Sequence, residues 1–569
     1  MPTSRSAAAP SVAASLRRNR DSNFFGTSTM TTLGSFLLKA LEARGVRHVF
    51  GIPGVHNLEL YRGLAASRIR HVGARHEQGL GFMADGYARI SGRPGVCFTI
   101  TGPGLTNITT ALAQAYGDSI PLLVISSENR TSEIGTGRGF LHETRDQLGI
   151  AARVTGFSHR LRTTEELPQV LQQAFNCMTS GRPRPAYIEI PRDLLDTGTS
   201  SWSMTEAIAG NSAARSQPLS DAPNLASVAQ QLSAATMPVM LVGGGARGAV
   251  AQVRQLAEMI GAPVVMTVNA RGLLPSHHPL AVPMSASLSV VRELLAAADV
   301  VLAVGTEFGP TDYDMYSKGD FPLLRNLLRI DIDAEQLQRG PQPAIGIKSA
   351  ATPALQSLLT LLAPAEPQPA RLLLGENRAR DARVRSLSEL TVPMRRQIEL
   401  LECIRDLLPA AIMVGDSTQP VYAGNLGFNA ASPGSWFNSA TGFGTLGYAL
   451  PAATGAGLAA PERPVICLTG DGGIQFSLGE LAVPRDVDAW LAIIVWNNHG
   501  YAEIKTSMQS IGIEPRGVDV RPPEFHHLAK AYGYVHQMID SLESLRRAIR
   551  VFGARRQIVV MEVRAELFE

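Results

Sequence analysis

Cysteine and long apolar runs are both scarce in this sequence of 569 residues, and each shortage excludes a class of protein. The four cysteines stand apart without any CxxC pair, which argues against a disulfide scaffold, a zinc site and a redox motif. They are Cys97, Cys177, Cys403 and Cys467. The longest strongly apolar stretches, such as 490–496, fall far short of the ~20 residues that span a bilayer. We therefore expect a cytoplasmic protein with reduced thiols and no membrane partner.

Charge is also sparse and nearly balanced. Charged residues make up 18% of the chain, and 52 Lys and Arg against 49 Asp and Glu leave a net charge of +3. So small an excess gives no basic surface for nucleic acid and no polybasic anchor. Hydrophobic residues reach 45%, which is typical of a globular protein with sizeable cores. We expect a small-molecule partner rather than nucleic acid.

The first 30 residues are rich in Ser, Ala and Arg and have no periodic apolar pattern. An organelle transit peptide shares this composition but would carry an amphipathic stripe. Residues 1–30 are therefore interpreted as a disordered N-terminal extension, or as the product of a start codon placed upstream of a true start at Met30.

From Thr31 onward, short runs rich in Val and Ile alternate with longer helical patterns, which predicts parallel sheets covered by helices. Segments rich in small residues and Pro, near 194–224 and 363–370, divide this pattern. The sequence thus predicts an α/β fold of three doubly wound parallel-sheet domains. Their expected ranges are 31–195, 222–364 and 385–569. Fold class alone says little about function, which must come from motifs.

The most informative motif lies in the third domain. A Gly-Asp-Gly-Gly segment at 470–473 follows one apolar strand, and an Asn-Asn pair at 497–498 follows the next. If these strands are neighbours, Asp471 and Asn498 meet at the carboxyl edge of the sheet, where open α/β sheets bind ligands. Carboxylate and amide oxygens suit Mg²⁺ or Ca²⁺, above all when diphosphate oxygens complete the shell, and glycines let the backbone approach a phosphate.

A Gly-Asp-Gly followed by Asn-Asn, with 26 residues between Asp471 and Asn498, resembles the magnesium–diphosphate motif of thiamine diphosphate enzymes. The likeness covers 31–569 and indicates the branch that contains acetolactate synthase and related 2-oxo acid decarboxylases. It implies thiamine diphosphate and Mg²⁺ as cofactors, with the metal bound by the side chains of Asp471 and Asn498 and the carbonyl of Gly500. The glycines that it implies in cofactor binding are Gly470, Gly472 and Gly473.

A second match lies in the first domain. The segment Ala74-Arg-His-Glu-Gln-Gly79, after Val49-Phe-Gly-Ile-Pro-Gly54, resembles the family segment that carries the cofactor-activating glutamate. The resemblance assigns that role to Glu77 and cofactor contact to Pro53. The chemistry needs a carboxyl group in a mostly apolar pocket, hydrogen-bonded to pyrimidine N1′ of the cofactor. Burial of that carboxyl group helps it to carry the proton. The alternative is an ordinary glutamate at a helix N-terminus.

Two further segments match the family. In the segment Gly442–Pro451, the resemblance implies that the Gly444 carbonyl accepts from the 4′ amino group and that Leu446 packs beneath the thiazolium ring. A plain glycine-rich loop that enters a helix is the alternative. The positions at which relatives contact the diphosphate hold Ser417, Thr418 and Gln419. Hydroxyl and amide residues are frequent in such loops, so this match is less specific.

The middle domain carries Gly243-Gly-Gly-Ala-Arg-Gly248 after a strand, which suggests a dinucleotide site. The run departs from GxGxxG in context, and no acidic residue closes a second strand at a suitable distance. Acetolactate synthases bind FAD in this domain through a glycine- and histidine-containing loop, which residues 281–288 lack. We therefore expect FAD to be absent. A dehydrogenase that uses this glycine run without thiamine is a remaining alternative.

Around the substrate, the chain departs from acetolactate synthases. It has Leu141-His142-Glu143 where they carry Phe-Gln-Glu, so His142 is a candidate acid/base or a histidine on an exposed loop. Glu503, just beyond Asn498, stands where synthases are apolar, and it is a candidate either to meet a cationic substrate or to donate a proton. Asp312 and Asp314 are reserve carboxylates, with an exposed loop as the alternative.

Together with the segment 311–314, these residues resemble 5-guanidino-2-oxopentanoate decarboxylases of the arginine transaminase route. The resemblance implies non-oxidative decarboxylation of a 2-oxo acid to an aldehyde and CO2, here 5-guanidino-2-oxopentanoate to 4-guanidinobutanal. The alternative is an acetolactate synthase-type carboligase that joins two 2-oxo acids. Relatives build each site across two subunits, so we expect a homodimer or homotetramer.

Overall fold

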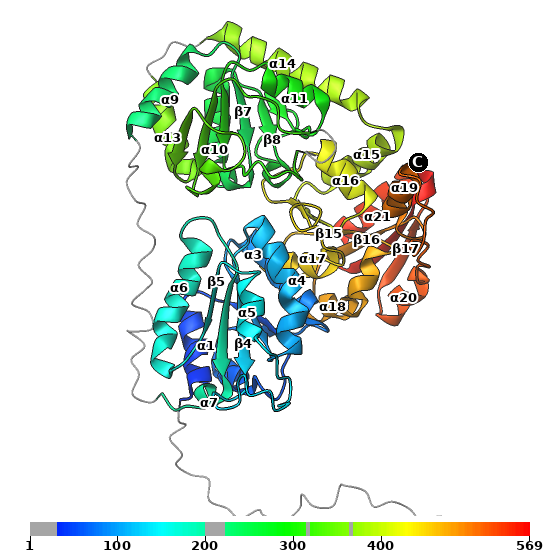
Figure 1. Cartoon of the computed structure of the whole chain (residues 1–569). Coiled ribbons are helices and arrows are strands. Elements are labelled where there is room, and N and C mark those ends of the chain that lie inside the picture. Colours follow the sequence, from blue (N-terminus) through cyan, green and yellow to red (C-terminus); the bar gives the residue numbers. More distant parts are fainter. Residues whose placement is uncertain (1–30, 200–221, 314–318, 364–367, 569) are drawn as a thin grey trace, which may run out of the picture.

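The computed structural model describes residues 31–199, 222–313, 319–363 and 368–568. In this part of the chain, three six-stranded parallel sheets alternate with helices (Figure 1). This confirms the predicted α/β fold of three doubly wound parallel sheets. The expected N-terminal extension at 1–30 and most of the predicted linker, 200–221, lie outside the described residues. No helix in the described ranges is long and apolar enough to cross a membrane.

The first sheet has the strand order β2-β1-β3-β4-β6-β5. Its central strands β3 and β4 are buried throughout, because helices cover both faces of a parallel sheet. The strands are β1 (His48–Gly51), β2 (Arg70–Val72), β3 (Gly95–Thr99), β4 (Leu122–Glu128), β5 (Phe157–Arg160) and β6 (Ala186–Pro191). The helices are α1 (Leu33–Ala43), α2 (Leu58–Arg62), α3 (Glu77–Ser91), α4 (Pro103–Asp118), α5 (Gln147–Ala152), α6 (Leu167–Thr179) and α7 (Arg192–Leu195).

The central sheet has the order β12-β11-β10-β7-β8-β9. Its strands are β7 (Val239–Val242), β8 (Val264–Met266), β9 (Ala281–Val282), β10 (Val301–Val304), β11 (Leu327–Asp331) and β12 (Ile345–Lys348). Its helices are α9 (Ala222–Ala234), α10 (Val250–Ile260), α11 (Ser289–Ala296) and α13 (Ala351–Leu362). The long helix α14 (Pro369–Ser388) packs on this domain, where Arg371 and Arg383 donate to the carbonyls of Leu232 and Ala281, each at 2.6 Å.

The third sheet has the order β14-β13-β15-β16-β18-β17. Its strands are β13 (Ile412–Gly415), β14 (Trp436–Asn438), β15 (Val465–Gly470), β16 (Leu491–Asn497), β17 (Val535–Ile539) and β18 (Ile558–Arg564). Its helices are α15 (Val392–Leu407), α16 (Gln419–Gly427), α17 (Ala449–Ala459), η7 (Gly473–Ala482), α18 (Val483–Asp486), α19 (Ala502–Ser510), α20 (Phe525–Ala531) and α21 (Leu542–Ala554). The register pairs Gly415 with Leu468 and Gly470 with Trp496, so β13, β15 and β16 end at one edge.

The first and third domains meet where α3 crosses α17 (Figure 1). A Cβ added to Gly86 or Gly455 would lie 2.0 or 1.9 Å from a carbonyl oxygen of the other helix, so close backbone approach requires glycine at both positions. Since α3 begins at Glu77 and α17 follows the loop at 442–447, this crossing sets two predicted cofactor segments relative to each other.

Candidate active site

Three loops of the third domain gather at the carboxyl edge of β13, β15 and β16. Residues 416–419 follow β13, 470–473 end and follow β15, and 498–500 follow β16. The loops are in contact, because a Cβ on Gly470 would lie 3.3 Å from Thr418 Oγ1. The structure therefore brings together the predicted diphosphate and metal segments, as the spacing of two neighbouring strands requires.

The predicted metal ligands converge as oxygen atoms that face one another, and the backbone N–H of Asn498 also donates to Asp471 Oδ1 at 3.4 Å. Asn498 Oδ1 lies 3.1 Å from Asp471 Oδ1 and 2.9 Å from the Gly500 carbonyl oxygen. Three acceptors cannot hydrogen-bond to one another, but neighbouring ligands of an octahedral Mg²⁺ at 2.0–2.1 Å lie about 3 Å apart. Asp471 Oδ2 is buried without a hydrogen-bond partner among the described residues, and burial raises the pKa of this carboxyl. The converging oxygen ligands therefore fit a divalent cation.

The backbone after Asn498 is shaped to present a carbonyl oxygen. His499 has φ 62° and Gly500 has φ 142°, both in the region that L side chains rarely adopt. A Cβ on Gly500 would lie 2.4 Å from the Val518 carbonyl oxygen, so only glycine is accommodated there. The carbonyl group of Gly500 thus lies beside Asn498. In the sequence, only the family resemblance had indicated this position.

Asp416, which the sequence analysis missed, ties two cofactor segments together. Its carboxylate accepts from the backbone N–H of Ser417 at 2.9 Å and of Gly447 at 3.0 Å. Burial raises the pKa of Asp416 to about 6. A Gly-Asp pair directly after a buried strand, the same local signal as in the 470–473 segment, could have identified it.

The loop at 441–447 has Gly442, Gly444 and Gly447 at positive φ, with Gly444 exposed and Leu446 half-buried. Residues of α4 anchor it from the first domain. The Thr441 hydroxyl lies 3.1 Å from Asp118 Oδ1, and the Thr445 N–H donates to Gln114 Oε1 at 3.4 Å. Sequence patterns gave no sign of these anchors, because each partner is more than 300 positions away.

A buried ion cluster supports the Asp118 anchor. Arg89 is enclosed and pairs through Nε with Asp85 at 2.6 Å and through Nη2 with Asp118 at 2.5 Å. The Tyr448 hydroxyl also donates to Asp85. Burial raises the pKa of Asp118, and Arg89 opposes that rise. Because Asp85 and Arg89 lie on α3, the helix that starts at Glu77 is connected to the 441–447 loop through paired charges.

Glu77 begins α3 at the carboxyl edge of the first sheet, with His76 as N-cap, and its side chain is only 9% exposed. Asn107 Nδ2 on α4 donates to Glu77 Oε2 at 2.9 Å. Glu480 of the third domain accepts from the backbone N–H of Arg75 and His76 at 3.0 and 2.9 Å, and burial raises its pKa. The start of α3 is therefore held in place, and a buried carboxyl group stands where the chemistry needs one.

His142 follows β4 at the same edge and is half-buried rather than exposed, so the exposed-loop interpretation is wrong. Its backbone has φ 62°, and its ring centroid lies 4.9 Å from that of His56. The Nδ1 atoms of both rings are buried without hydrogen-bond partners among the described residues. Burial lowers the pKa of His56, and Arg192 and His142 lower it further. Pro53, the remaining predicted cofactor contact of the first domain, is exposed in the loop that follows β1.

Glu503 lies in the first turn of α19 with an exposed side chain. Burial raises the pKa of Tyr422 on α16, and the carboxylates of Glu503 and Asp416 raise it further. Gln419 on the same helix accepts through Oε1 from Asn498 Nδ2 at 3.2 Å. The carboxylate predicted to face substrate therefore lies on the helix that directly follows the metal loop in the chain.

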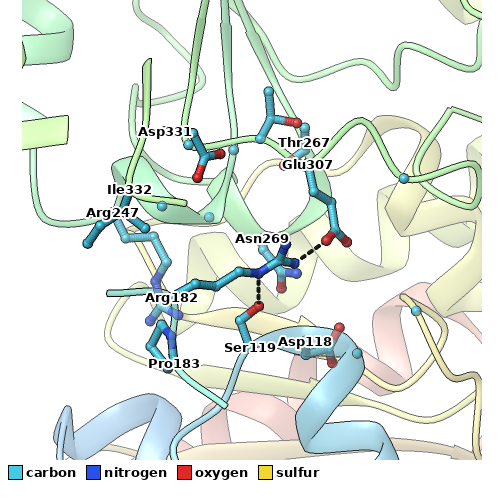
Figure 2. Close-up of a pocket in the computed structure, with 18 of the residues that line it drawn as sticks. Asp118, Ser119, Arg182, Pro183, Arg247, Thr267, Asn269, Glu307, Asp331 and Ile332 are labelled. Carbon is cyan, nitrogen blue, oxygen red and sulfur yellow. Dashed lines mark hydrogen bonds and ion pairs between the residues drawn. The ribbon is translucent and has the colours of Figure 1, made fainter. Parts of the chain in front are cut away.

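A cavity of about 580 Å³ opens at the carboxyl edge of the central sheet, beside the glycine run 243–245, and is also lined by Asp118, Thr441 and Gly442 (Figure 2). Arg182 of the first domain crosses it and pairs with Glu307, while its Nε donates to Ser119 Oγ at 2.8 Å. Asp331, far from the glycine run in sequence, closes β11 at this edge and was missed.

Asp312 lines the central cavity and is half-buried, so the exposed-loop expectation is wrong for this residue. Burial raises its pKa to about 7. Asp314 lies outside the described residues. Asp312 therefore belongs to the central cavity, whereas Glu503 lies on the helix that follows the metal loop.

Comparison with known proteins agrees with this geometry. Three family models match the chain: the N-terminal TPP binding domain of thiamine pyrophosphate enzymes over 31–150, their central domain over 225–358 and their C-terminal TPP binding domain over 416–563. The converging oxygens lie within the third match, and Glu77 lies within the first.

Relatives match along nearly the whole chain. A probable 2-ketoarginine decarboxylase of Pseudomonas aeruginosa is 42% identical over 543 residues, 94% of each chain. The acetolactate synthase isozyme 1 large subunit of Escherichia coli is 34% identical over 480 residues, 82% of each chain. An acetolactate synthase of Arthrospira platensis is 30% identical over 557 residues, 93% of this chain and 94% of the relative. The chain therefore belongs to the thiamine pyrophosphate (thiamine diphosphate) enzymes, a family whose N- and C-terminal domains bind that cofactor.

Proposed function

We propose that this enzyme decarboxylates 5-guanidino-2-oxopentanoate (2-ketoarginine) to 4-guanidinobutanal and CO2, with thiamine diphosphate and Mg²⁺. The observation that carries the proposal is the 42% identity to a probable 2-ketoarginine decarboxylase over 94% of both chains, compared with 34% to an acetolactate synthase. The carboxylate of Glu503, beside the metal loop, is the local feature that suits a cationic substrate.

The residues divide the chemistry among them. Bound thiamine diphosphate supplies the nucleophile and the electron sink for loss of CO2. Asp471, Asn498 and Gly500 would hold Mg²⁺ against its diphosphate through the three converging oxygens. Glu77, buried and oriented by Asn107, would hold a proton at pyrimidine N1′. Gly444, which is exposed, and Leu446, which is half-buried, would support the bent cofactor.

Two groups are candidates to move the proton that ends the reaction. Glu503 lies in the first turn of α19, just after the metal loop, and His142 stands at the carboxyl edge of the first sheet beside His56. A guanidinium pairs best with a carboxylate through two parallel hydrogen bonds, and leaving it unpaired in a pocket is costly. We therefore assign substrate recognition to Glu503 and proton donation to His142.

The experiment compares Glu503→Gln with wild type on 5-guanidino-2-oxopentanoate and on an uncharged 2-oxo acid of equal length, by CO2 release. We expect kcat/KM to fall only for the cationic substrate, by about 10–100-fold because a charged hydrogen bond is worth about 1.5–3 kcal/mol. Glu514→Gln, an exposed carboxylate in the segment after α19, is the matched control. Equal losses on both substrates would instead make Glu503 the proton donor, and acetolactate formation from pyruvate would support the carboligase alternative.

We further propose a cytoplasmic homodimer or homotetramer. Apolar side chains that are more than half exposed lie in or near the cofactor segments of both domains, and exposed apolar groups that gather on one face mark protein interfaces. They are Val55, Leu58, Leu141, Phe443 and Phe476. A second copy would cover them and complete each site. Light scattering of active enzyme tests this, and an active monomer would contradict it.

We also propose that the enzyme works without FAD. The guanidinium of Arg182 already crosses the central cavity and is bound by Glu307, Gln336 and Ser119, which supports this view. The test is extraction of the purified enzyme, with flavin absorbance expected to be absent. Stoichiometric flavin would overturn it.

A further inference from the structure

Gln419 stands where relatives contact the diphosphate, yet its side chain faces the metal loop. Gln419 Oε1 accepts from Trp496 Nε1 at 2.8 Å and from Asn498 Nδ2 at 3.2 Å. Trp496 is buried in β16, and an indole nitrogen is a donor only. The Gln419 atom that faces Trp496 must therefore be the oxygen, and the same oxygen needs a donor from Asn498.

This polarity decides which atom Asn498 offers to a cation. With its nitrogen against Gln419, Asn498 directs Oδ1 to within 3.1 Å of Asp471 Oδ1 and 2.9 Å of the Gly500 carbonyl oxygen. Turned over, the amide would donate to both of those oxygens and place its own oxygen 3.2 Å from Gln419 Oε1. The turned state satisfies two acceptors and replaces the oxygen ligand with an NH2 group. This turned orientation is unfavourable because the Asn498 amide oxygen and Gln419 Oε1, which are both acceptors, would face each other.

We infer that Gln419, oriented by Trp496, is a positioning residue that keeps the Asn498 amide oxygen directed at the metal. The inference rests on the proposed Mg²⁺ site and adds its mechanism of assembly. Without the acceptor at Gln419, the amide turns over and hydrogen-bonds to Asp471 and Gly500. A cation must then displace these hydrogen bonds, so its affinity falls.

The test measures binding of Mn²⁺ in the presence of thiamine diphosphate, by electron paramagnetic resonance on the full-length protein. Gln419→Leu removes the acceptor, and we expect about 10–100-fold weaker Mn²⁺ binding, the range typical when a group that orients a metal ligand is lost. Gln419→Glu keeps an oxygen that accepts from both donors, so we expect binding near the wild-type value. The thermal midpoint of the metal-free Gln419→Leu protein should fall below wild type, because the turned amide satisfies Asp471 and Gly500 but the N–H of Trp496 loses its acceptor.

Trp496→Phe provides a second variant that leaves Gln419 in place. It keeps the ring packed in β16 but removes the N–H group, so Gln419 loses the donor that orients it. We expect weaker Mn²⁺ binding here too, by less than in Gln419→Leu. This variant carries the test if Gln419→Leu does not fold.

The outcomes separate this inference from the function on which it rests. If wild type binds no Mn²⁺ with thiamine diphosphate, the metal site itself is wrong. If wild type binds it and both Gln419→Leu and Trp496→Phe bind equally well, only the positioning role is overturned. If Gln419→Leu and Gln419→Glu both lose thiamine diphosphate affinity while Trp496→Phe does not, Gln419 is a diphosphate contact and the inference is likewise overturned.

Discussion

The carboxyl edges of the central and third sheets carry the same kind of segment, a glycine run at the end of a buried strand, but they pair their charges differently. At the third sheet, Asp471 Oδ2 is buried without a described partner and three oxygens face one another. At the central sheet, the guanidinium of Arg182 is met by a carboxylate, an amide oxygen and a hydroxyl. Buried polar groups are normally paired, so unpaired ones indicate where a ligand belongs.

The structural reasons for glycine also differ between the two edges. A Cβ on Gly243 would lie 2.3 Å from the Gly305 carbonyl oxygen, so packing within the central domain requires that glycine. Gly444, in contrast, has φ 75° and no atom within 4 Å of an added Cβ. Open space beside a glycine is compatible with a ligand, whereas contact with the protein's own backbone explains the residue fully. A glycine run is therefore informative only with its surroundings.

The largest expected effect tests the third edge. Asp471→Ala removes the one carboxylate of the converging oxygens, so we expect thiamine diphosphate binding with Mg²⁺ to weaken strongly and decarboxylation to be lost. Calorimetric titration of the cofactor and CO2 release measure this. Glu462→Gln is the matched control, an exposed carboxyl group before the amino end of the same strand. Activity in metal-free, cofactor-free protein would break the comparison.

The next effect tests the first domain. Glu77→Gln keeps the size of the side chain and its contact with Asn107 but cannot carry a proton. Thiamine diphosphate should still bind, while exchange of its C2 proton slows by about 10²–10⁴-fold, the usual contribution of a general acid or base. Exchange of the C2 proton is followed by NMR after acid quench. A wild-type exchange rate in the variant would show that Glu77 does not activate the cofactor.

The sequence predicts the central strands and the metal segments well, because each depends on local information. Buried strands are continuous apolar runs, and the residues at their ends fall together once the strands are parallel neighbours. The edge strands β5, β9, β12, β14 and β17 were not predicted. β5, β12 and β17 are partly exposed, and β9 and β14 have only 2 and 3 residues, so none forms a long apolar run.

Long-range partners account for what the sequence analysis missed at the site. Asn107, Gln114 and Asp118 lie on α4, and nothing in their spacing shows that they reach Glu77 or the 441–447 loop. Their roles follow from the packing of α4 against α3 and from the crossing of α3 and α17, which are tertiary facts. The polarity of Gln419 is likewise visible only once Trp496 is seen to donate to it.

A smaller effect tests the anchoring of the cofactor loop. Thr441→Val removes the hydroxyl that faces Asp118 but keeps the shape of the side chain. A hydrogen bond to a charged group contributes about 1.5–3 kcal/mol, so we expect thiamine diphosphate affinity to fall roughly tenfold or more. Thr441→Ser keeps the hydroxyl and serves as the control. Fluorescence titration measures both, and equal affinity in Val and Ser variants would show that the anchor does not position the loop.

The smallest effect tests the central cavity at the ion pair between Arg182 and Glu307. Arg182→Gln breaks the ion pair with Glu307, whose side chain is 39% exposed. Because solvent screens such a pair, its loss should lower the free energy of unfolding by only about 0–1 kcal/mol. Thiamine diphosphate affinity should be unchanged, since Arg182 contacts none of the converging oxygens or the 441–447 loop among its described hydrogen bonds. Thermal unfolding and cofactor titration of the same preparation give both numbers.

This pattern is the reverse of that expected for Thr441→Val, which should weaken cofactor binding more than it destabilises the fold. A large loss of cofactor affinity in Arg182→Gln would show that the central cavity and the cofactor site are coupled. The pairing of charges would then not distinguish an edge that binds no ligand from one that does.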